Sequence, residues 1–76
     1  MIIIFKTLTF KSYDIEINND DTILLLKKKI QNITGIHPLE QNLYFKLTKL
    51  FEDTYTLNDY NITDNSIVFF SPHLRK

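Results

Sequence analysis

Two histidines and two pairs of adjacent acidic residues are the side chains of this sequence best suited to catalysis or metal binding. Proton transfer in an active site needs an imidazole or carboxyl group placed beside a second reactive group. His37 and His73 are each isolated in the sequence, and cysteine is absent. Asp20–Asp21 and Glu52–Asp53 could bind a cation weakly, but helix capping and turns explain both pairs better. We therefore predict a protein that is not an enzyme, without catalytic residues, metal or cofactor.

The length and charge of the chain narrow the class of protein further. Its 76 residues are enough for one small domain, residues 1–76. Nine basic and nine acidic residues cancel, whereas a general nucleic-acid binder carries a basic excess. No apolar run is long enough for a membrane span, and the first residues lack the basic start of a signal peptide. We expect a cytoplasmic or nuclear protein that binds neither nucleic acid nor membrane.

The elements that must position the polar side chains begin with two strands. Residues 1–17 are rich in β-branched and aromatic residues, which favour strands. Alternation predicts that Ile2 and Ile4 point outward. It predicts the following inward-facing residues: Ile3, Phe5, Tyr13, Ile15 and Ile17. The connection over residues 7–11 lacks glycine, so we expect a loop with a bulge rather than a two-residue turn.

A helix is predicted between the acidic residues at 20–21 and the only glycine, Gly35. Asp20–Asp21 and Thr22 suit the N-cap and the positive end of the helix dipole, and Gly35 suits a C-terminal position with positive φ. One apolar stripe follows the helical spacing: Ile23, Leu26, Ile30 and Ile33. Leu24 and Leu25 lie off this stripe, and Lys27–Lys29 are better explained as a solvated face than as a binding patch.

The second half of the chain adds strands and predicts the fold class. Residues 41–47 form a third strand, 48–53 a short strand or turn, and 54–63 a loop in which Thr56, Asn58 and Asp59 cap nearby backbone. In the last strand, Val68 and Phe70 face opposite to Ile67 and Phe69. The order β-β-α-β-(β)-β indicates an α+β fold. The first and last strands are apolar on both faces, so we expect them side by side at the sheet centre.

Several short segments resemble the ubiquitin family at that family's spacing. They are "KTLT", "DTI" leading into the helix with "KKKIQ", "GIHP" and "LNDYNI". The resemblance runs from Met1 to about Arg75, nearly the whole chain. It implies a single ubiquitin-like domain over residues 1–76 with the β-grasp fold, a mixed sheet with one helix packed across it.

One insertion interrupts the resemblance after the third strand. The family has a short glycine-containing turn there, and this chain reads "KLTKLF", one residue longer and without glycine. Later positions then shift by one, which places Phe51 in the core. The same shift pairs Lys27 with Asp53, where the family has a partly buried ionic pair, and we interpret that pair as structural.

The resemblance implies three apolar surfaces for protein recognition. The main patch would contain Leu8, Tyr44, Phe69 and Ser71 on the exposed sheet face. Aromatic residues and a serine replace the usual aliphatic residues and histidine, so we expect standard ubiquitin receptors to bind weakly, although the cluster still suits an amphipathic helix. A second patch would combine Ile36 with Leu74. A third would combine Ile2 and Ile4 with Phe10.

The last residues and the lysines decide whether the chain can be joined covalently to other proteins. In conjugated family members, a flexible arm ends in Gly-Gly, whose carboxylate is joined to lysine amines. Here Leu74 and Arg75 match the arm, His73 replaces an arginine, and Lys76 stands in place of the first glycine. We therefore expect that the terminus as written is not conjugated in the usual way. The candidate linkage lysines are Lys6, Lys11, Lys27, Lys29 and Lys49.

Three hypotheses for the function remain. The first is a non-covalent binding module or mimic, whose partners are ubiquitin-binding or ubiquitin-pathway proteins. The alternative is a covalent modifier whose Gly-Gly ending is truncated or absent from this chain. The third is a self-assembling protein, suggested by the apolar Ile2 and Ile4 face. We expect a monomer, with self-association left open by that face.

Overall fold

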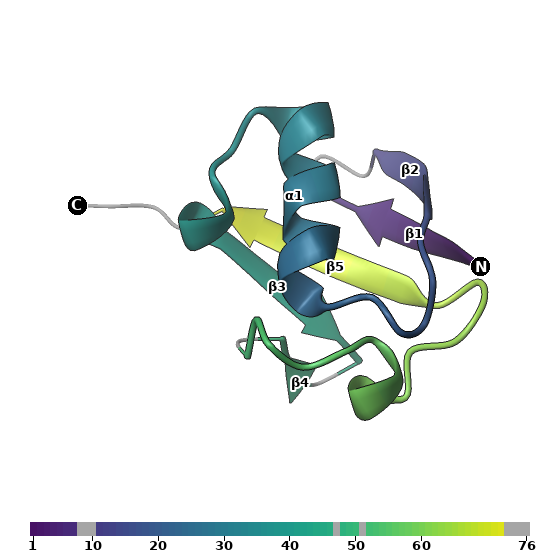
Figure 1. The fold of residues 1–76 in the computed structure, drawn as a ribbon. Helices are drawn as coiled ribbons and strands as arrows, with labels where there is room; N and C mark the ends of the chain where they lie inside the picture. Colours follow the sequence, from purple (N-terminus) through teal and green to yellow (C-terminus); the bar gives the residue numbers. More distant parts are fainter. Residues whose placement is uncertain (8–10, 47, 51, 73–76) are drawn as a thin grey trace.

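A five-stranded mixed sheet with one long helix across it makes up the protein in the computed structural model (Figure 1). The structure describes residues 1–7, 11–46, 48–50 and 52–72. The sheet has the order β2-β1-β5-β3-β4. Its strands are β1 Ile2–Lys6, β2 Ser12–Glu16, β3 Gln41–Phe45, β4 Thr48–Lys49 and β5 Ile67–Pro72. The helix is α1 Ile23–Thr34, and two short 3₁₀ turns are η1 Pro38–Glu40 and η2 Asn58–Tyr60. The predicted α+β architecture is confirmed.

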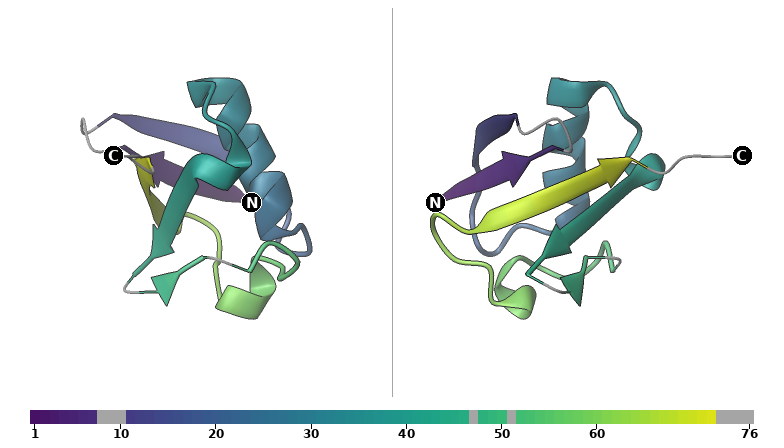
Figure 2. Two further views of the ribbon diagram at one scale, coloured as in Figure 1. Left: turned by 90° about the vertical axis from the view of Figure 1, so that its left-hand side faces the viewer. Right: turned by 180° about the vertical axis from the view of Figure 1, so that it is seen from behind.

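The first and last strands lie side by side inside the sheet, as expected. β1 and β5 are parallel, with Ile4 level with Ile67 and Phe5 level with Val68. β2 flanks β1 and β3 flanks β5, each antiparallel to its neighbour, as Figure 2 shows. Both strands are therefore hydrogen-bonded on two sides, which suits their β-branched and aromatic composition.

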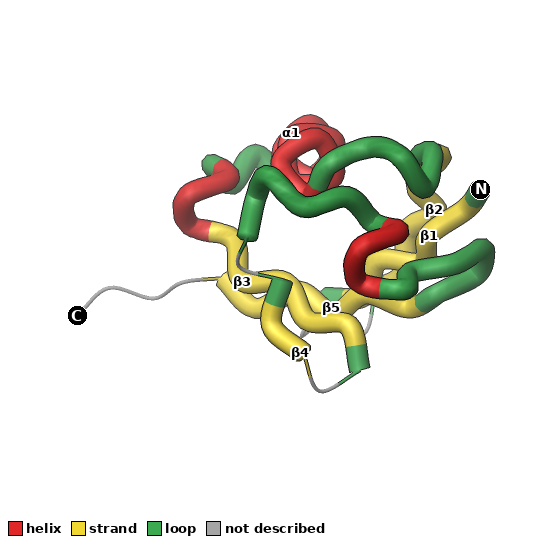
Figure 3. The backbone as a smooth tube through the Cα atoms, turned by 60° about the horizontal axis from the view of Figure 1, so that its bottom comes forward, coloured by secondary structure: helices red, strands yellow, loops and turns green. Residues whose placement is uncertain are grey.

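The core lies between the sheet and α1, which covers one face of the sheet (Figure 3). The ring centroids of Phe5 and Phe70 lie 5.4 Å apart, and those of Phe5 and Tyr13 lie 6.0 Å apart. Aromatic pairs at such separations add to the stability gained by burial. The buried apolar residues are Ile3, Phe5, Ile15, Ile17, Ile23, Leu26, Ile30, Leu43, Phe45, Leu50, Leu57, Ile62, Val68 and Phe70.

Both ends of α1 have the caps that the sequence predicts. The Thr22 hydroxyl accepts a hydrogen bond from the backbone N–H of Leu25 at 3.3 Å. Gly35 has φ +77°, and its N–H donates to the carbonyl of Gln31 at 2.7 Å. The apolar stripe is shorter than predicted, because Ile33 is 41% exposed. Ile36, beyond the glycine, packs against the core at this end of the helix instead.

Gly35→Ala is expected to lower the free energy of unfolding by about 1 kcal/mol, because a side chain strains a left-handed backbone. An added Cβ would meet no atom within 4 Å, so the cost arises from the backbone conformation alone. Urea unfolding measures the change. Gly35→Asn is the control and should cost less, since asparagine tolerates positive φ. Equal stability of Gly35→Ala and the unmodified protein would contradict this account.

The segment after β3 adds a core residue that was not predicted. The core position at the end of β4 is filled by Leu50, which is 1% exposed and whose N–H donates to the carbonyl of Leu43 at 2.8 Å. Phe51 lies outside the described residues. Lys46 forms the tight turn between β3 and β4 with φ +56°.

The loop before η2 is closed by Thr56 and Asp59, two of the three residues predicted to cap nearby backbone. The Asp59 carboxylate accepts from the N–H of Thr56 at 2.9 Å, and the Thr56 hydroxyl accepts from the N–H of Asp59 at 3.1 Å. This reciprocal pair is a capping arrangement that satisfies two backbone donors. Among the described residues, η2 is the only helical element between β4 and β5.

Candidate functional site

The sheet has a second face, opposite α1, that no described element covers (Figure 3). We call it the open face. Because side chains alternate along a strand, the residues between the core positions point toward it. By the strand register, the open face contains Ile2, Ile4, Lys6, Ser12, Asp14, Glu16, Asn42, Tyr44, Lys49, Ile67, Phe69 and Ser71.

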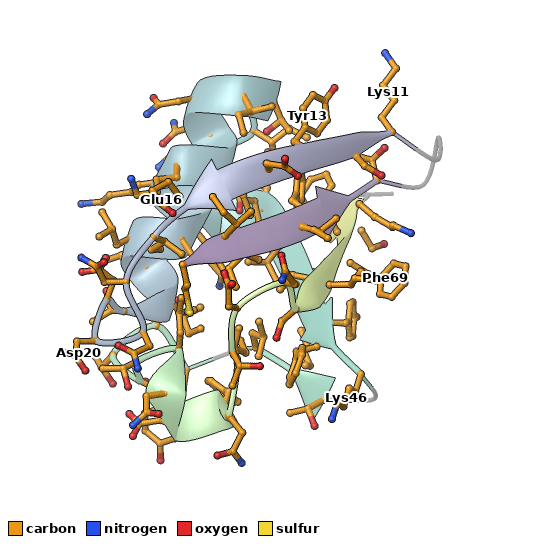
Figure 4. The ribbon with its side chains drawn as sticks, turned by 90° about the vertical axis from the view of Figure 1, so that its right-hand side faces the viewer. Lys11, Tyr13, Glu16, Asp20, Lys46 and Phe69 are labelled. Atoms are coloured by element: carbon orange, nitrogen blue, oxygen red, sulfur yellow. The ribbon has the colours of Figure 1, made fainter. Side chains whose placement is uncertain are left out.

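The centre of the open face is apolar. Phe69 on β5 lies level with Lys6 on β1 and with Tyr44 on β3. Two residues earlier on β5, Ile67 lies level with Ile4 on β1. Phe69 is 50% exposed and Ile67 38% exposed, and Figure 4 shows the Phe69 ring projecting away from the helix. Neighbouring exposed apolar side chains on a flat sheet are suited to contact with another protein.

The two rims of the open face carry opposite charge. Asp14 and Glu16 are exposed on edge strand β2, and the Glu16 carboxylate lies 3.4 Å from the amino group of Met1. At the opposite rim, Lys49 on β4 lies level with Tyr44 on β3, and Lys46 is exposed in the turn after β3. The Lys46 amine sits 5.3 Å from the centroid of the Phe45 ring. On the open face, the apolar centre and Lys6 therefore lie between two acidic residues on β2 and Lys49 on β4.

The structure brings together three of the four residues predicted for the main patch. Tyr44 on β3 is the direct partner of Phe69 on β5. Ser71, two residues after Phe69, lies level with Asn42. Leu8 lies outside the described residues. Ile67 and Ile4 were not assigned to this patch, although their outward orientation was predicted and could have suggested it. Their adjacency follows only from the parallel register of β1 and β5.

The second predicted patch is less accessible than the first. Ile36 is half-buried and packs against the core, so only part of its surface can contact a partner. Leu74 lies outside the described residues, as does Phe10, which was predicted to extend the Ile2 and Ile4 surface. Ile2 and Ile4 themselves are half-buried on the open face.

The five candidate linkage lysines differ in accessibility, and Lys27 needs a correction. Lys11 and Lys49 are exposed, and Lys6 and Lys29 are half-buried. Lys27 is only 6% exposed, and its amine donates to the Asp53 carboxylate at 2.8 Å. The expected ionic pair is therefore confirmed. A solvated position for Lys27 is wrong, and its amine could be modified only after this ion pair opens.

The histidine and acidic pairs that could do chemistry have local structural partners. His37 caps η1, since its Nδ1 accepts from the N–H of Leu39 at 3.1 Å. Asp21 accepts from the N–H of Asn18 at 3.0 Å, and Glu52 accepts from the Thr54 hydroxyl at 3.0 Å. His73 lies outside the described residues. Within the described ranges, no three metal-ligating side chains gather, and no helix is long and apolar enough to cross a membrane.

Comparison with known proteins gives relatives of two kinds. The chain is 37% identical to the NEDD8-like protein RUB3 of Arabidopsis thaliana over 70 residues, which is 92% of this chain and 88% of that protein. It is 32% identical to the ubiquitin-like protein NEDD8 of Dictyostelium discoideum over 75 residues, 99% of this chain and 96% of that protein. It is also 34% identical to the AN1-type zinc finger protein 4 of Mus musculus over 64 residues, 84% of this chain. That match spans only 8% of the mouse protein.

A family model described as the ubiquitin family matches residues 3–75. The matched range includes the helix and every described strand apart from Ile2, the first residue of β1. The β-grasp arrangement of these elements and the two NEDD8-like relatives agree with this match. The chain belongs to the ubiquitin family.

Proposed function

We propose that this protein is a non-covalent binding module of the ubiquitin system, which docks partner proteins on its open face. The observation that carries the proposal is the exposed apolar centre around Phe69, which is 50% exposed beside Tyr44 and Ile67. Such a surface costs solubility unless a partner covers it. The partners are ubiquitin-binding or ubiquitin-pathway proteins, encountered in the cytoplasm or nucleus.

The chemistry of the open face favours an amphipathic helix as the docked segment. The Phe69–Tyr44 pair supplies an apolar platform, and Lys6 and Lys49 lie level with it on the two neighbouring strands. A helix places apolar residues on one side at i, i+3 and i+4, with acidic residues able to reach flanking lysines. Aromatic anchors contribute a large share of binding energy at interfaces of this kind.

Titration of isotope-labelled protein with a ubiquitin-binding helix tests this proposal. We expect chemical-shift changes at Tyr44, Ile67 and Phe69, and we expect Phe69→Ala to weaken binding at least tenfold because it removes the central aromatic contact. Tyr55→Ala is the matched control, since Tyr55 is also 50% exposed but packs on Tyr60 in the loop before β5. If the open-face residues show no chemical-shift change even with a large excess of the helix, the proposal is overturned.

A covalent modifier is the second candidate, favoured by the two NEDD8-like relatives that this chain matches over most of their length. Exposed Lys11 and Lys49 would then be the first linkage sites to test, because their amines reach solvent. The gene sequence after the codon for Lys76 distinguishes the two candidates. Two glycine codons there would favour the modifier, and a stop codon would favour the binding module.

A further inference from the structure

One edge of the sheet is formed by β2, and no described strand pairs with its outer side. The N–H of Ile4 on β1 points away from β2 and donates to the carbonyl of Ser66 at 2.8 Å. Asp14 is the partner of Ile4 in the register. Residues directly opposed in an antiparallel pair turn their backbone groups either toward each other or both away. Because this direction alternates along a strand, Ser12, Asp14 and Glu16 present N–H and C=O groups to the outer side of β2.

We propose that this edge binds an extended segment of a partner protein, which adds to the sheet as a further strand antiparallel to β2. Unpaired N–H and C=O groups along an edge strand are the groups that such a segment bonds, and antiparallel pairing is the more stable arrangement per residue. β2 has five residues, whereas β4 at the other edge has only two. The edge is separate from the apolar centre of the open face, so the inference goes beyond the proposed function.

The charges beside the edge select a basic partner. Asp14 and Glu16 are exposed and point toward the open face. The Glu16 carboxylate lies 3.4 Å from the amino group of Met1, whereas Asp14 forms no ion pair with a described residue. Residues of an added strand that lie opposite these two would point to the same face, where Lys or Arg would meet carboxylates. A second copy of β2 would instead place acid against acid, which disfavours self-pairing.

The helix side of the same edge favours apolar side chains. Lys27 points toward Asp53, after β4, and so marks the flank of α1 that faces away from β2. At about 100° per residue, Lys29 and Ile33 lie on the opposite flank, and Ile33 is 41% exposed. Figure 4 shows the Tyr13 ring between β2 and the C-terminal end of α1. Alternate residues of an added strand would therefore face two apolar side chains and one cation, which excludes basic residues there.

The ligand is thus an extended segment in which basic and apolar residues alternate. The probe is the peptide Arg-Val-Arg-Val-Thr with an acetylated and an amidated end, whose arginines pair with Glu16 and Asp14 and whose threonine pairs with Ser12. Solvent-exchange rates of the protein amides, measured by NMR with excess peptide, should fall at least threefold at these three residues. Tyr13 and Ile15 already bond to β1 by the same alternation, so their rates should change less than about twofold.

Modified peptides separate strand pairing from simple charge attraction. N-methylation of the second arginine removes the donor that faces Asp14 and should weaken binding at least tenfold. N-methylation of the first valine removes a donor that points away from β2 and should change binding less than about threefold. Glu-Val-Glu-Val-Thr keeps the backbone but reverses the charge, and it should bind at least tenfold more weakly. Added salt should weaken the binding of the arginine peptide.

Protein variants test the two sides of the edge. Asp14→Lys should weaken binding of the arginine peptide at least fivefold, and Asp20→Lys is the matched control, because Asp20 is an exposed acid in the turn before α1. Ile33→Ser should weaken binding about threefold, whereas Leu39→Ser, at a position 83% exposed in η1, should leave it unchanged. Urea unfolding of every variant confirms that it is folded.

The outcomes separate this inference from the proposed function. Unchanged exchange rates at Ser12, Asp14 and Glu16 with a large excess of peptide would overturn the inference, even if a ubiquitin-binding helix still shifts Phe69. Equal binding of the arginine and glutamate peptides would also overturn it, since the carboxylates would then select nothing. Slowed exchange along β2 in a protein that binds no ubiquitin-binding helix would support the inference and overturn the proposed function alone.

Discussion

Replacing Leu50 by alanine is expected to lower the free energy of unfolding by about 3 kcal/mol, the largest change among the variants considered. Leu50 is 1% exposed in the core beneath β4. Its backbone N–H also bonds to Leu43, which holds its side chain over the sheet and limits collapse into the space left by truncation. Urea unfolding monitored by circular dichroism measures the loss.

Leu39→Ala is the matched control for this prediction. Leu39 is 83% exposed in η1, so the same truncation should change stability by no more than about 0.5 kcal/mol. If Leu50→Ala were as mild as Leu39→Ala, the core position would belong to another residue.

Asp53→Ala is expected to cost about 2 kcal/mol, the second large effect. The Lys27 side chain is 8% exposed and the Asp53 side chain 33% exposed, and their charged atoms lie 2.8 Å apart. Removing the carboxylate leaves a desolvated ammonium group without its partner. Breaking a fully buried ion pair costs about 3–5 kcal/mol, and the partial exposure of Asp53 reduces that penalty through solvent screening.

A second substitution distinguishes loss of the charge pair from simple disruption of the loop. Lys27→Met removes the buried charge while retaining most of the side-chain volume, so the combined Lys27→Met/Asp53→Ala variant should be more stable than Asp53→Ala alone. Thermal unfolding of the four proteins gives the coupling. Strictly additive effects would contradict an energetic role for the contact.

The fold was predictable because its signals are local and agree with one another. Alternation in residues 12–17, a capping threonine at position 22 and a glycine at position 35 each indicate one element. The errors lie where such signals end. β4 has only two residues, too few for alternation to show that Leu50 is buried. Helical spacing places Ile33 on the apolar stripe, but spacing cannot show where the sheet beneath the helix stops.

The candidate site was only partly predictable for a different reason. Tyr44 and Phe69 follow from the family resemblance, and alternation along the last strand separates Phe69 from Val68 and Phe70. That Ile4 and Ile67 complete the apolar centre depends on the register between strands far apart in the sequence. The opposed rims depend on the order of the strands across the sheet. Neither property is encoded in any short segment, so both required the three-dimensional structure.

The parallel pairing of β1 with β5 also has a consequence for how the chain reaches its native state. The strand at the middle of the sheet is the one that comes latest in the sequence, and Asp64 just before it accepts a hydrogen bond from the N–H of Ile2 at 2.7 Å. Contacts between distant positions slow folding, because a large loop must close before they form. During synthesis, the earlier strands and α1 have no central strand to join until residues 67–72 have emerged from the ribosome. Folding is therefore a late event that begins only once almost the whole domain has been translated.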